Sequence, residues 1–254
     1  MPTVAELSAP YGNFMLAPRR GPSVCPMCFD LLGADGRCYS CAHGGPPLDA
    51  MAPISYSVAG EQLHQALVSY KRMWGEPARH FELGLAAVLW RHLAGHEPCL
   101  ARAAGVGADA FAVVTTVPSS WRERSQAHPL QQLVGDLVGP ARGRYARVLE
   151  RSTAPTDPHR FSAAKYTARG TLAGRSVLLI DDTWTTGANA RSAAAALKAA
   201  DAGPVAALVI GRHVNRGWHH NDRQLRSLAQ TFDWDRCAVC GEEKSPLATG
   251  DSRV

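Results

Sequence analysis

Apolar positions follow two different spacings along the chain, and the change falls near residue 111. Before it, Glu61–Met73 and Phe81–Leu93 each place apolar side chains on one helical face, which predicts two helices. After it, short apolar runs alternate with helical patterns: Phe111–Val117, Leu130–Val138, Arg147–Glu150, Val177–Ile180, Ala188–Ala200 and Val205–Ile210. Runs this apolar suit strands covered on both sides, so the alternation predicts an α/β fold with a mainly parallel sheet and helices on both faces.

The same pattern divides the chain into four regions. Residues 1–50 form an N-terminal segment with a compact unit rich in Cys and Gly, 51–106 a helical hood, 107–235 the α/β core and 236–254 a C-terminal tail. Within the first region, residues 1–23 are rich in Pro and Gly and show no clear period, which predicts a lead-in without regular structure.

Length and charge change this picture little. The 254 residues carry a formal net charge of +5, too dilute to argue for nucleic acid by itself, although it suits a phosphate-bearing ligand. No apolar run approaches the roughly 18 residues that a membrane span needs. The first residues lack the basic and apolar stretches of a secretory signal, so we expect a protein of the reducing cytoplasm.

The seven cysteines include two closely spaced Cys-x-x-Cys pairs. An odd number of cysteines in a reducing compartment argues against a disulfide framework and favours metal ligands. The pairs, Cys25 with Cys28 and Cys38 with Cys41, supply four thiolates, which complete a tetrahedral shell and leave no position for water. We therefore expect one structural zinc ion, with His43 as an alternative to one of the thiolates.

A third pair, Cys237 and Cys240, has no fourth partner pair. It closes on His219 or His220, joins the first metal site, or stays a reduced pair without metal, and the number of available ligands favours the last of these. Metal binding by Cys237 and Cys240 is therefore the weaker of the two metal predictions.

A buried strand at Val177–Ile180 leads into Asp181, Asp182 and the turn Thr183-Trp-Thr-Thr-Gly-Ala188, and an Ala-rich helix follows. In an open parallel sheet, ligands collect at the carboxyl ends of strands, and a turn that begins a helix presents unpaired amides to an anion. Gly187 permits close backbone approach, and the two acids can accept hydrogen bonds from vicinal sugar hydroxyls. The segment therefore predicts a ribose 5-phosphate site. It is no P-loop and no dinucleotide fingerprint, because neither glycine pattern is present.

Residues 177–188, Val-Leu-Leu-Ile-Asp-Asp-Thr-Trp-Thr-Thr-Gly-Ala, resemble the phosphoribosyl-pyrophosphate (PRPP) motif of type I phosphoribosyltransferases. With the four-Cys segment and the helices before the core, the chain resembles the ComF/GntX-like branch from about Cys25 to His213. The resemblance implies that Asp181 and Asp182 are catalytic and hold the ribose 2′- and 3′-hydroxyls. It also implies the PRPP-binding residues: Thr183, Thr185, Thr186, Gly187 and Ala188 around the ribose phosphate, and Pro118, Ser119, Ser120 and Arg122 around the pyrophosphate.

The implied reaction transfers the 5-phosphoribosyl group of PRPP, bound with Mg²⁺, to an unidentified amine or nitrogen heterocycle and releases pyrophosphate. Residues 151–165 stand where the family has a mobile loop that closes over PRPP. The alternative is a non-catalytic adaptor that senses PRPP or binds nucleic acid or a protein, in keeping with the family's association with DNA uptake in competent bacteria. A homodimer stays open, and no membrane partner is expected.

Two arrangements would count against the ribose-phosphate prediction. In one, the side chains of Asp181 and Asp182 turn inward into salt links. In the other, Trp184 fills the turn and leaves no room for an anion. We also expect Cys28→Ser to cost the zinc ion and yet leave the ribose site formed.

Overall fold

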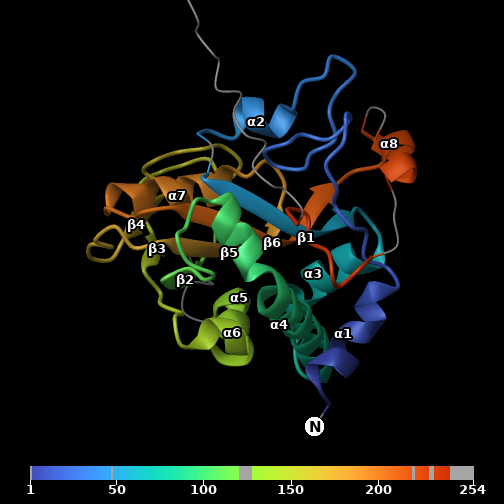
Figure 1. Cartoon of the computed structure of the whole chain (residues 1–254), viewed down its shortest axis with the longest axis horizontal. Helices are drawn as coiled ribbons and strands as arrows, with labels where there is room; N and C mark the ends of the chain where they lie inside the picture. The colour runs from blue at the N-terminus through green and yellow to red at the C-terminus, as the bar shows by residue number, and fades with distance from the viewer. Residues whose placement is uncertain (1, 47, 120–127, 219–220, 229–231, 241–254) are drawn as a thin grey trace, which may run out of the picture.

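Four parallel strands form the central sheet of the molecule, shown in the computed structural model of Figure 1. The structure describes residues 2–46, 48–119, 128–218, 221–228 and 232–240. The strands are β1 (Ala50–Val58), β2 (Val113–Thr116), β5 (Val177–Trp184) and β6 (Val205–Val214), in the spatial order β1-β6-β5-β2. The predicted α/β fold with a parallel sheet is therefore confirmed.

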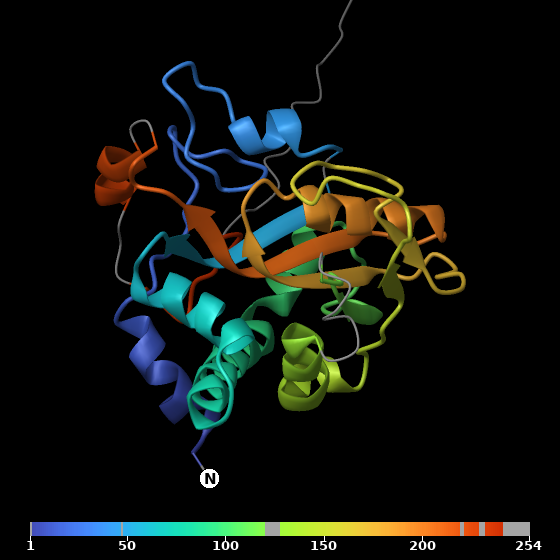
Figure 2. The same ribbon diagram turned by 180° about the vertical axis from the view of Figure 1, so that it is seen from behind.

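Helices cover both faces of this sheet (Figure 2). The helices α3 (Gln62–Arg72) and α4 (Glu76–Ala103) pack on one face, and α7 (Ala188–Ala199) packs on the other. The two helices predicted between residues 61 and 93 are confirmed, although α4 extends further in both directions. Between these layers, the side chains of Val177–Ile180 are fully buried. Within the described residues, none of the helices has both the length and the apolar character that crossing a bilayer requires.

Short elements complete the described chain. The apolar run 130–138 forms helical turns, and a small antiparallel hairpin stands beside the main sheet. These elements are α1 (Val4–Gly12), α2 (Tyr39–His43), α5 (Pro129–Gln132), the π-helical turn η2 (Leu133–Leu137), α6 (Gly139–Arg142), β3 (Leu149–Arg151), β4 (Tyr166–Ala168) and α8 (Asn221–Leu228).

Strand β1 lies inside the region predicted as a helical hood, so that prediction is wrong for residues 51–58. Pro53, Ser55 and Ser57 interrupt the apolar run and hid the strand, yet all three are buried. Pro53 is tolerated because β1 lies at the edge of the sheet and pairs there with β6 alone among the main strands. On the outer side of β1, the amide of Tyr56 donates to the carbonyl of Leu16, 2.9 Å away.

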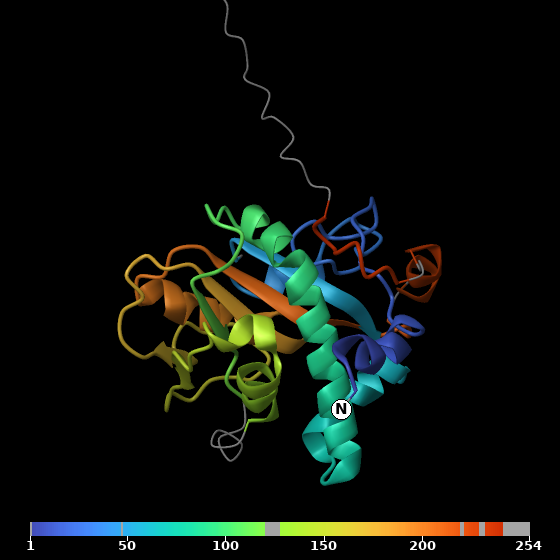
Figure 3. The same cartoon turned by 60° about the horizontal axis from the view of Figure 1, so that its bottom comes forward.

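Residues 1–23 contain a helix, α1, where no regular structure was expected. Thr3 and Glu6 form a reciprocal capping box at its start, in which each side chain accepts a hydrogen bond from the other residue's backbone N–H. The helix then lies against α4 (Figure 3). A Cβ added to Gly84 of α4 would lie 2.5 Å from the hydroxyl of Tyr11, so the contact requires a glycine there. Tertiary packing on α4 thus fixes a short helix that contains an internal proline.

Strand β5 is longer than the apolar run that predicted it and continues to Trp184. Asp181 and Thr183 stay in register with Val209 and Gly211 of β6. The two acids therefore belong to the last residues of the strand itself, and the turn into α7 begins after them.

Candidate functional site

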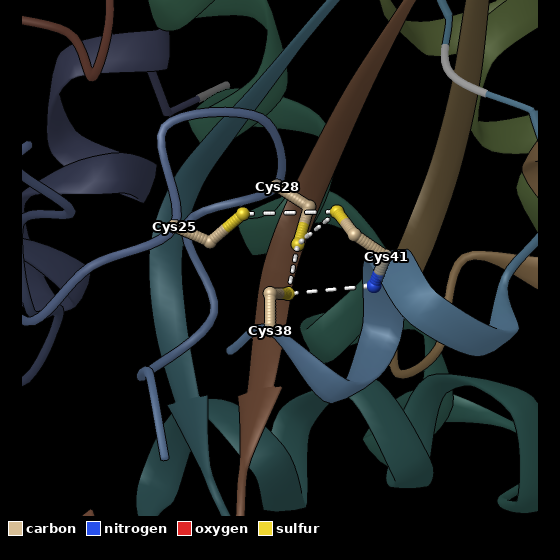
Figure 4. Close-up of side chains that lie close together, drawn as sticks. All are labelled: Cys25, Cys28, Cys38 and Cys41. Carbon is tan, nitrogen blue, oxygen red and sulfur yellow. Dashed lines mark hydrogen bonds between the residues drawn. The ribbon is translucent and has the colours of Figure 1, made fainter. Parts of the chain in front are cut away.

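Four cysteine thiols converge in the four-cysteine unit, which we define as residues 24–45 (Figure 4). The Sγ–Sγ distances are 3.7 Å for Cys25–Cys41, 3.6 Å for Cys28–Cys41 and 3.5 Å for Cys28–Cys38. Four thiolates bound tetrahedrally at about 2.3 Å from one zinc ion lie about 3.8 Å apart. The four side chains can therefore hold a metal ion, and their geometry is compatible with the structural zinc that the spacing predicted.

Hydrogen-bond donors surround the sulfur atoms of this cluster. The guanidinium of Arg191 donates to Cys41 Sγ at 3.3 Å, and the amide of Cys41 donates to Cys38 Sγ at 3.4 Å. Such donors stabilise the negative charge that metal-binding thiolates carry. His43 is not among the side chains whose ligand atoms come together here; its Nδ1 lies 2.9 Å from the carbonyl of Tyr39.

The four-cysteine unit packs directly against the turn that follows β5. The hydroxyl of Ser40 donates to the carbonyl of Thr185 at 3.2 Å. A Cβ added to Gly44 would lie 2.6 Å from the carbonyl oxygen of Thr186. Arg191, at the start of α7, adds a hydrogen bond of 2.8 Å to the carbonyl of Gly45. Two consecutive carbonyls of the turn therefore face the four-cysteine unit.

The amides of the same turn point the other way. In a trans peptide, the N–H of one residue is directed opposite to the C=O of the residue before it. The N–H groups of Thr186 and Gly187 are therefore directed away from the four-cysteine unit, and they donate to no group in the described part of the chain. They lie at the N-terminus of α7, where the helix dipole also favours an anion. This side of the turn can accept a phosphate.

Trp184 packs on the carbonyl side of the turn. Its indole is 1% exposed, and the Arg191 guanidinium that contacts the four-cysteine unit lies 5.6 Å from the ring centroid. Gly187 has φ +77°, and a Cβ there would lie 2.1 Å from the indole, so both the backbone conformation and the packing require glycine. The indole supports the turn from the interior, which differs from the arrangement in which it would exclude an anion.

The two acids of β5 have different partners. One Asp182 carboxylate oxygen accepts hydrogen bonds from the Tyr70 hydroxyl and from the Lys71 ammonium, the latter at 2.5 Å. Asp182 is 4% exposed and is paired with Lys71. Its side chain therefore forms the inward salt link that counts against the ribose-phosphate prediction. Asp181 is half-buried, forms no ion pair with any described residue, and accepts the amide of Asp182 at 2.9 Å. We expected both acids to hold ribose hydroxyls in the same way, but Asp182 is engaged by Lys71 and Tyr70 whereas Asp181 is not.

The surroundings of the two acids also separate their pKa values. Burial, together with the adjacent Asp182 carboxylate, raises the pKa of Asp181 to about 8. Burial acts in the same direction on Asp182, but the Lys71 charge and the hydrogen bonds from Lys71 and Tyr70 outweigh it and lower the pKa of Asp182. At neutral pH Asp181 therefore keeps its proton while Asp182 is ionised, a division often found where two acids share a functional site.

The end of β2 lies next to this pair. The amide of Val117 donates to the carbonyl of Ile180 at 3.0 Å. Pro118 and Ser119, which follow Val117, therefore lie near Asp181, which follows Ile180. The hydroxyl of Tyr166 donates to the Pro118 carbonyl at 3.2 Å. The other residues predicted to bind pyrophosphate, Ser120 and Arg122, lie outside the described residues, as does the neighbouring Arg124.

Around the turn itself, the predicted phosphate-binding residues stand together. Thr185 is exposed, Thr183 is half-buried, and Ala188 is the first residue of α7. The hydroxyl of Thr186 accepts the amide of Ala188 at 3.3 Å. These five residues, which are neighbours in the sequence, run from the last residues of β5 into the first residue of α7 at the carboxyl edge of the sheet.

Lys165 anchors the segment that was expected to be a mobile loop. It is fully buried, and its ammonium donates to the Arg160 carbonyl at 2.7 Å and to the Asn189 side chain at 3.0 Å. The amide of Ser162 also donates to Ser192 of α7, 3.0 Å away. Tyr70 and Lys71 are site neighbours that the sequence reasoning missed. No spacing rule links them to the motif, since they come from a separate helix, α3.

Cys237 and Cys240 do not join the four-cysteine unit. The structure brings them instead to His96 and Cys99 of α4, and these four side chains form a second group that can hold a metal ion. The interpretation as a reduced tail pair therefore overlooked their packing. His219 and His220, the histidine partners considered from the sequence, lie outside the described residues.

Comparison of the chain with family models, with curated proteins and with solved structures finds no significant match.

Proposed function

We propose that the carboxyl edge of the sheet binds PRPP and that the protein transfers its 5-phosphoribosyl group to a nitrogen nucleophile. One observation carries this proposal: two carbonyls of the turn face the four-cysteine unit, so the amides of Thr186 and Gly187 are directed away from it, at the edge of the sheet where β5 carries Asp181. An anion cradle beside an acid that has no ion-pair partner among the described residues suits a phosphate attached to a hydroxylated ring. The proposed fold family is that of type I phosphoribosyltransferases, as the motif implies.

Each part of this edge has a separate role in the proposal. The 5′-phosphate accepts hydrogen bonds from the turn amides and from the exposed hydroxyl of Thr185. Asp181 accepts a ribose hydroxyl. Asp182 positions the strand end through Lys71 and Tyr70, and it contacts the ribose only through the carboxylate oxygen that these two residues leave unengaged. Pro118 and Ser119 line the pyrophosphate side.

The proposed reaction is a substitution at the anomeric carbon. A bond forms between the nucleophile's nitrogen and C1, the bond from C1 to the pyrophosphate oxygen breaks, and its electron pair leaves with pyrophosphate. PRPP enters as its magnesium complex, which supplies charge neutralisation for the leaving diphosphate. Asp181 stabilises the positive charge that develops on the ring once it has lost its proton, so the transfer should be faster above pH 8 than at neutral pH. No protein histidine is needed, because the proton released from nitrogen passes to solvent.

The four-cysteine unit has a structural role in this proposal. Four thiolates around one zinc ion leave no position for water or substrate, so the site stabilises rather than reacts. The unit contacts the carbonyls of Thr185 and Thr186, and in this proposal it thereby stabilises the backbone conformation in which the turn amides are directed toward the phosphate.

Calorimetric titration of the full chain with PRPP and Mg²⁺ tests the binding step. We expect Gly187→Ala to weaken PRPP binding at least tenfold. We expect the same of Asp181→Asn at pH 9, where the carboxyl is ionised and the substitution removes a charge-assisted hydrogen bond. The matched controls are Gly170→Ala, which also has positive φ but no neighbour within 4 Å, and Asp109→Asn, which is exposed. Because an ionised carboxylate accepts a hydrogen bond more strongly than a protonated carboxyl does, PRPP affinity should rise between pH 7 and pH 9 as Asp181 loses its proton. Absence of binding by the unaltered chain, or equal affinities in all four variants, contradicts the proposal.

Release of pyrophosphate with a panel of amines and nucleobases tests the transfer step. Release that requires an acceptor and is lost in Asp181→Asn supports the enzyme. PRPP binding without release from any acceptor supports the alternative, a PRPP-sensing adaptor, and rejects the transferase.

A further inference from the structure

A second cluster of metal-binding side chains lies on α4, away from the turn. His96 and Cys99 stand three residues apart on the helix, so they share one face. Cys237 and Cys240 reach that face from the C-terminal segment, residues 232–240. One ligand atom from each of the four side chains lies within 4.8 Å of all the others.

The sulfur–sulfur distances within this cluster are slightly shorter than those between thiolates bound to one zinc ion. Cys99 Sγ lies 3.4 Å from Cys240 Sγ, and Cys237 Sγ lies 3.1 Å from the same atom. His96 Nδ1 lies 3.4 Å from Cys240 Sγ. Tetrahedral zinc spaces its sulfur ligands about 3.8 Å apart, so an outward shift of a few tenths of an ångström admits the ion.

The histidine is oriented as a ligand. His96 Nε2 lies 2.8 Å from the backbone carbonyl of Trp234, which can only accept a hydrogen bond, so Nε2 carries the proton. In the neutral ring, which is the form that binds metals, Nδ1 then carries the lone pair, and it faces Cys240 Sγ. Metal-binding histidines use this arrangement, in which a carbonyl holds one ring N–H and fixes the other nitrogen for the metal.

We propose that His96, Cys99, Cys237 and Cys240 bind a second zinc ion. Three thiolates and one imidazole in a compact set favour zinc over the oxygen-seeking cations. Four protein ligands close the coordination shell, so the ion is structural. It links the middle of the chain to its C-terminal segment, because Cys99 and Cys240 are 141 positions apart.

Other contacts show what this ion stabilises. The ring of Trp234 lies under the Arg91 guanidinium, 4.2 Å from its centroid, and Arg19 donates to the Cys237 carbonyl at 3.1 Å. A Cβ added to Gly12 at the end of α1 would lie 3.3 Å from the Trp234 indole nitrogen. The second zinc ion therefore fastens residues 232–240 over α4 and the end of α1.

Zinc content of the purified full chain is the first test. We expect two zinc ions per chain, and one per chain in His96→Ala, with unchanged content in His80→Ala, an exposed histidine on the same helix. His96→Cys should restore two ions, because it replaces one zinc ligand by another. One zinc ion per unaltered chain, with the same content in His96→Ala, overturns the proposal.

Cobalt substitution keeps the test decisive if a variant folds poorly. In the unaltered chain, Co²⁺ should give the absorption of two tetrahedral thiolate sites, and His96→Cys should convert one of them to the four-thiolate spectrum. Thiol titration of the denatured chain under metal-free, non-reducing conditions should count seven reactive cysteines. Five reactive cysteines, rising to seven after reduction, show a disulfide in place of the second zinc and overturn the proposal.

Discussion

The two cysteine clusters differ in how far apart their ligands are in the sequence and in what they support. Cys25 and Cys41 of the first are 16 positions apart, whereas Cys99 and Cys240 of the second are 141 apart. The first packs against the turn at the carboxyl edge of the sheet, and the second holds a terminal segment on α4. The first cluster can therefore influence the turn, because residues of its unit contact the turn's backbone, whereas the second can influence the segment that it brings to α4.

The strongest test of this contrast removes one thiolate from each cluster. Cys28→Ser should lower the free energy of unfolding by about 4 kcal/mol or more, because it removes a structural metal, and it should abolish PRPP binding. This revises the expectation that the ribose site survives, since the turn depends on the four-cysteine unit. Cys237→Ser should release a metal ion and still bind PRPP. For both variants, metal analysis measures the zinc content, urea unfolding the stability and calorimetry the PRPP affinity. Equal loss of PRPP binding in Cys28→Ser and Cys237→Ser would contradict the proposed difference between the two clusters.

Next in size is the buried arginine that joins the first cluster to the sheet. Arg212 of β6 is 1% exposed, pairs with Asp30 at 2.7 Å, and donates to the carbonyls of Cys28 and Trp184. Arg212→Met should cost about 3–5 kcal/mol, because it leaves a buried carboxylate without its partner. Adding Asp30→Asn should recover part of that loss.

The control for this prediction is Arg216→Met. Arg216 forms partly exposed ion pairs with Glu61 and Asp222, so its loss should cost no more than about 1 kcal/mol. Chemical unfolding measures the free energy of unfolding of all the variants. Similar losses of stability for the two arginines would show that Arg212 does not stabilise the four-cysteine unit against the sheet.

A smaller effect, of opposite sign, is expected at the acids beside the turn. The folded chain holds Asp181 with a pKa of about 8 against an ordinary value of 3.8, so between about pH 4 and pH 8 the unfolded chain releases a proton that the folded chain keeps. Stability contributed by this group therefore falls as the pH rises through that window. Asp181→Asn should raise the free energy of unfolding at pH 8 by at least about 1 kcal/mol and flatten its pH dependence.

Asp182→Asn is the matched comparison for that result. Its lowered pKa reflects the Lys71 ion pair, so this substitution should destabilise the chain at pH 8. Urea unfolding from pH 5 to pH 9 measures both variants, and destabilisation by Asp181→Asn would contradict the assigned environment of that acid.

The smallest expected effect lies at the second cluster. Arg91→Gln removes the cation over the ring of Trp234 and should cost about 0.5–1 kcal/mol, with no change in PRPP affinity. Thermal unfolding and calorimetry measure it. A loss of PRPP binding here would show that the segment over α4 communicates with the turn.

The sequence predicted features whose signals are local. The helical spacing of apolar residues predicted α3, and the apolar run at 177–180 predicted β5. The two Cys-x-x-Cys pairs predicted the first cysteine cluster. Strand β1 was not predicted because its sequence lacks a continuous apolar run, although its residues from Met51 to Val58 are buried. The helix α1 had a readable signal in its capping box at Thr3 and Glu6, but the prolines around it were given more weight.

Partners that come from distant elements could not be predicted. Tyr70 reaches Asp182 across 112 positions of the chain, and nothing in either local sequence names the other. The same holds for His96 and Cys240, which are 144 positions apart. These contacts exist only once the sheet has ordered its strands and α4 has packed across it.

The position of residues 232–240 on α4 has a consequence for biosynthesis. During translation α4 emerges long before this segment does, and domains generally fold from the N-terminal side first. The surface around His96 and Cys99 therefore stays uncovered on the ribosome until the last described residues have been made. The last strand of the sheet ends at Val214, so a nascent chain can complete its sheet before residues 232–240 cover this surface.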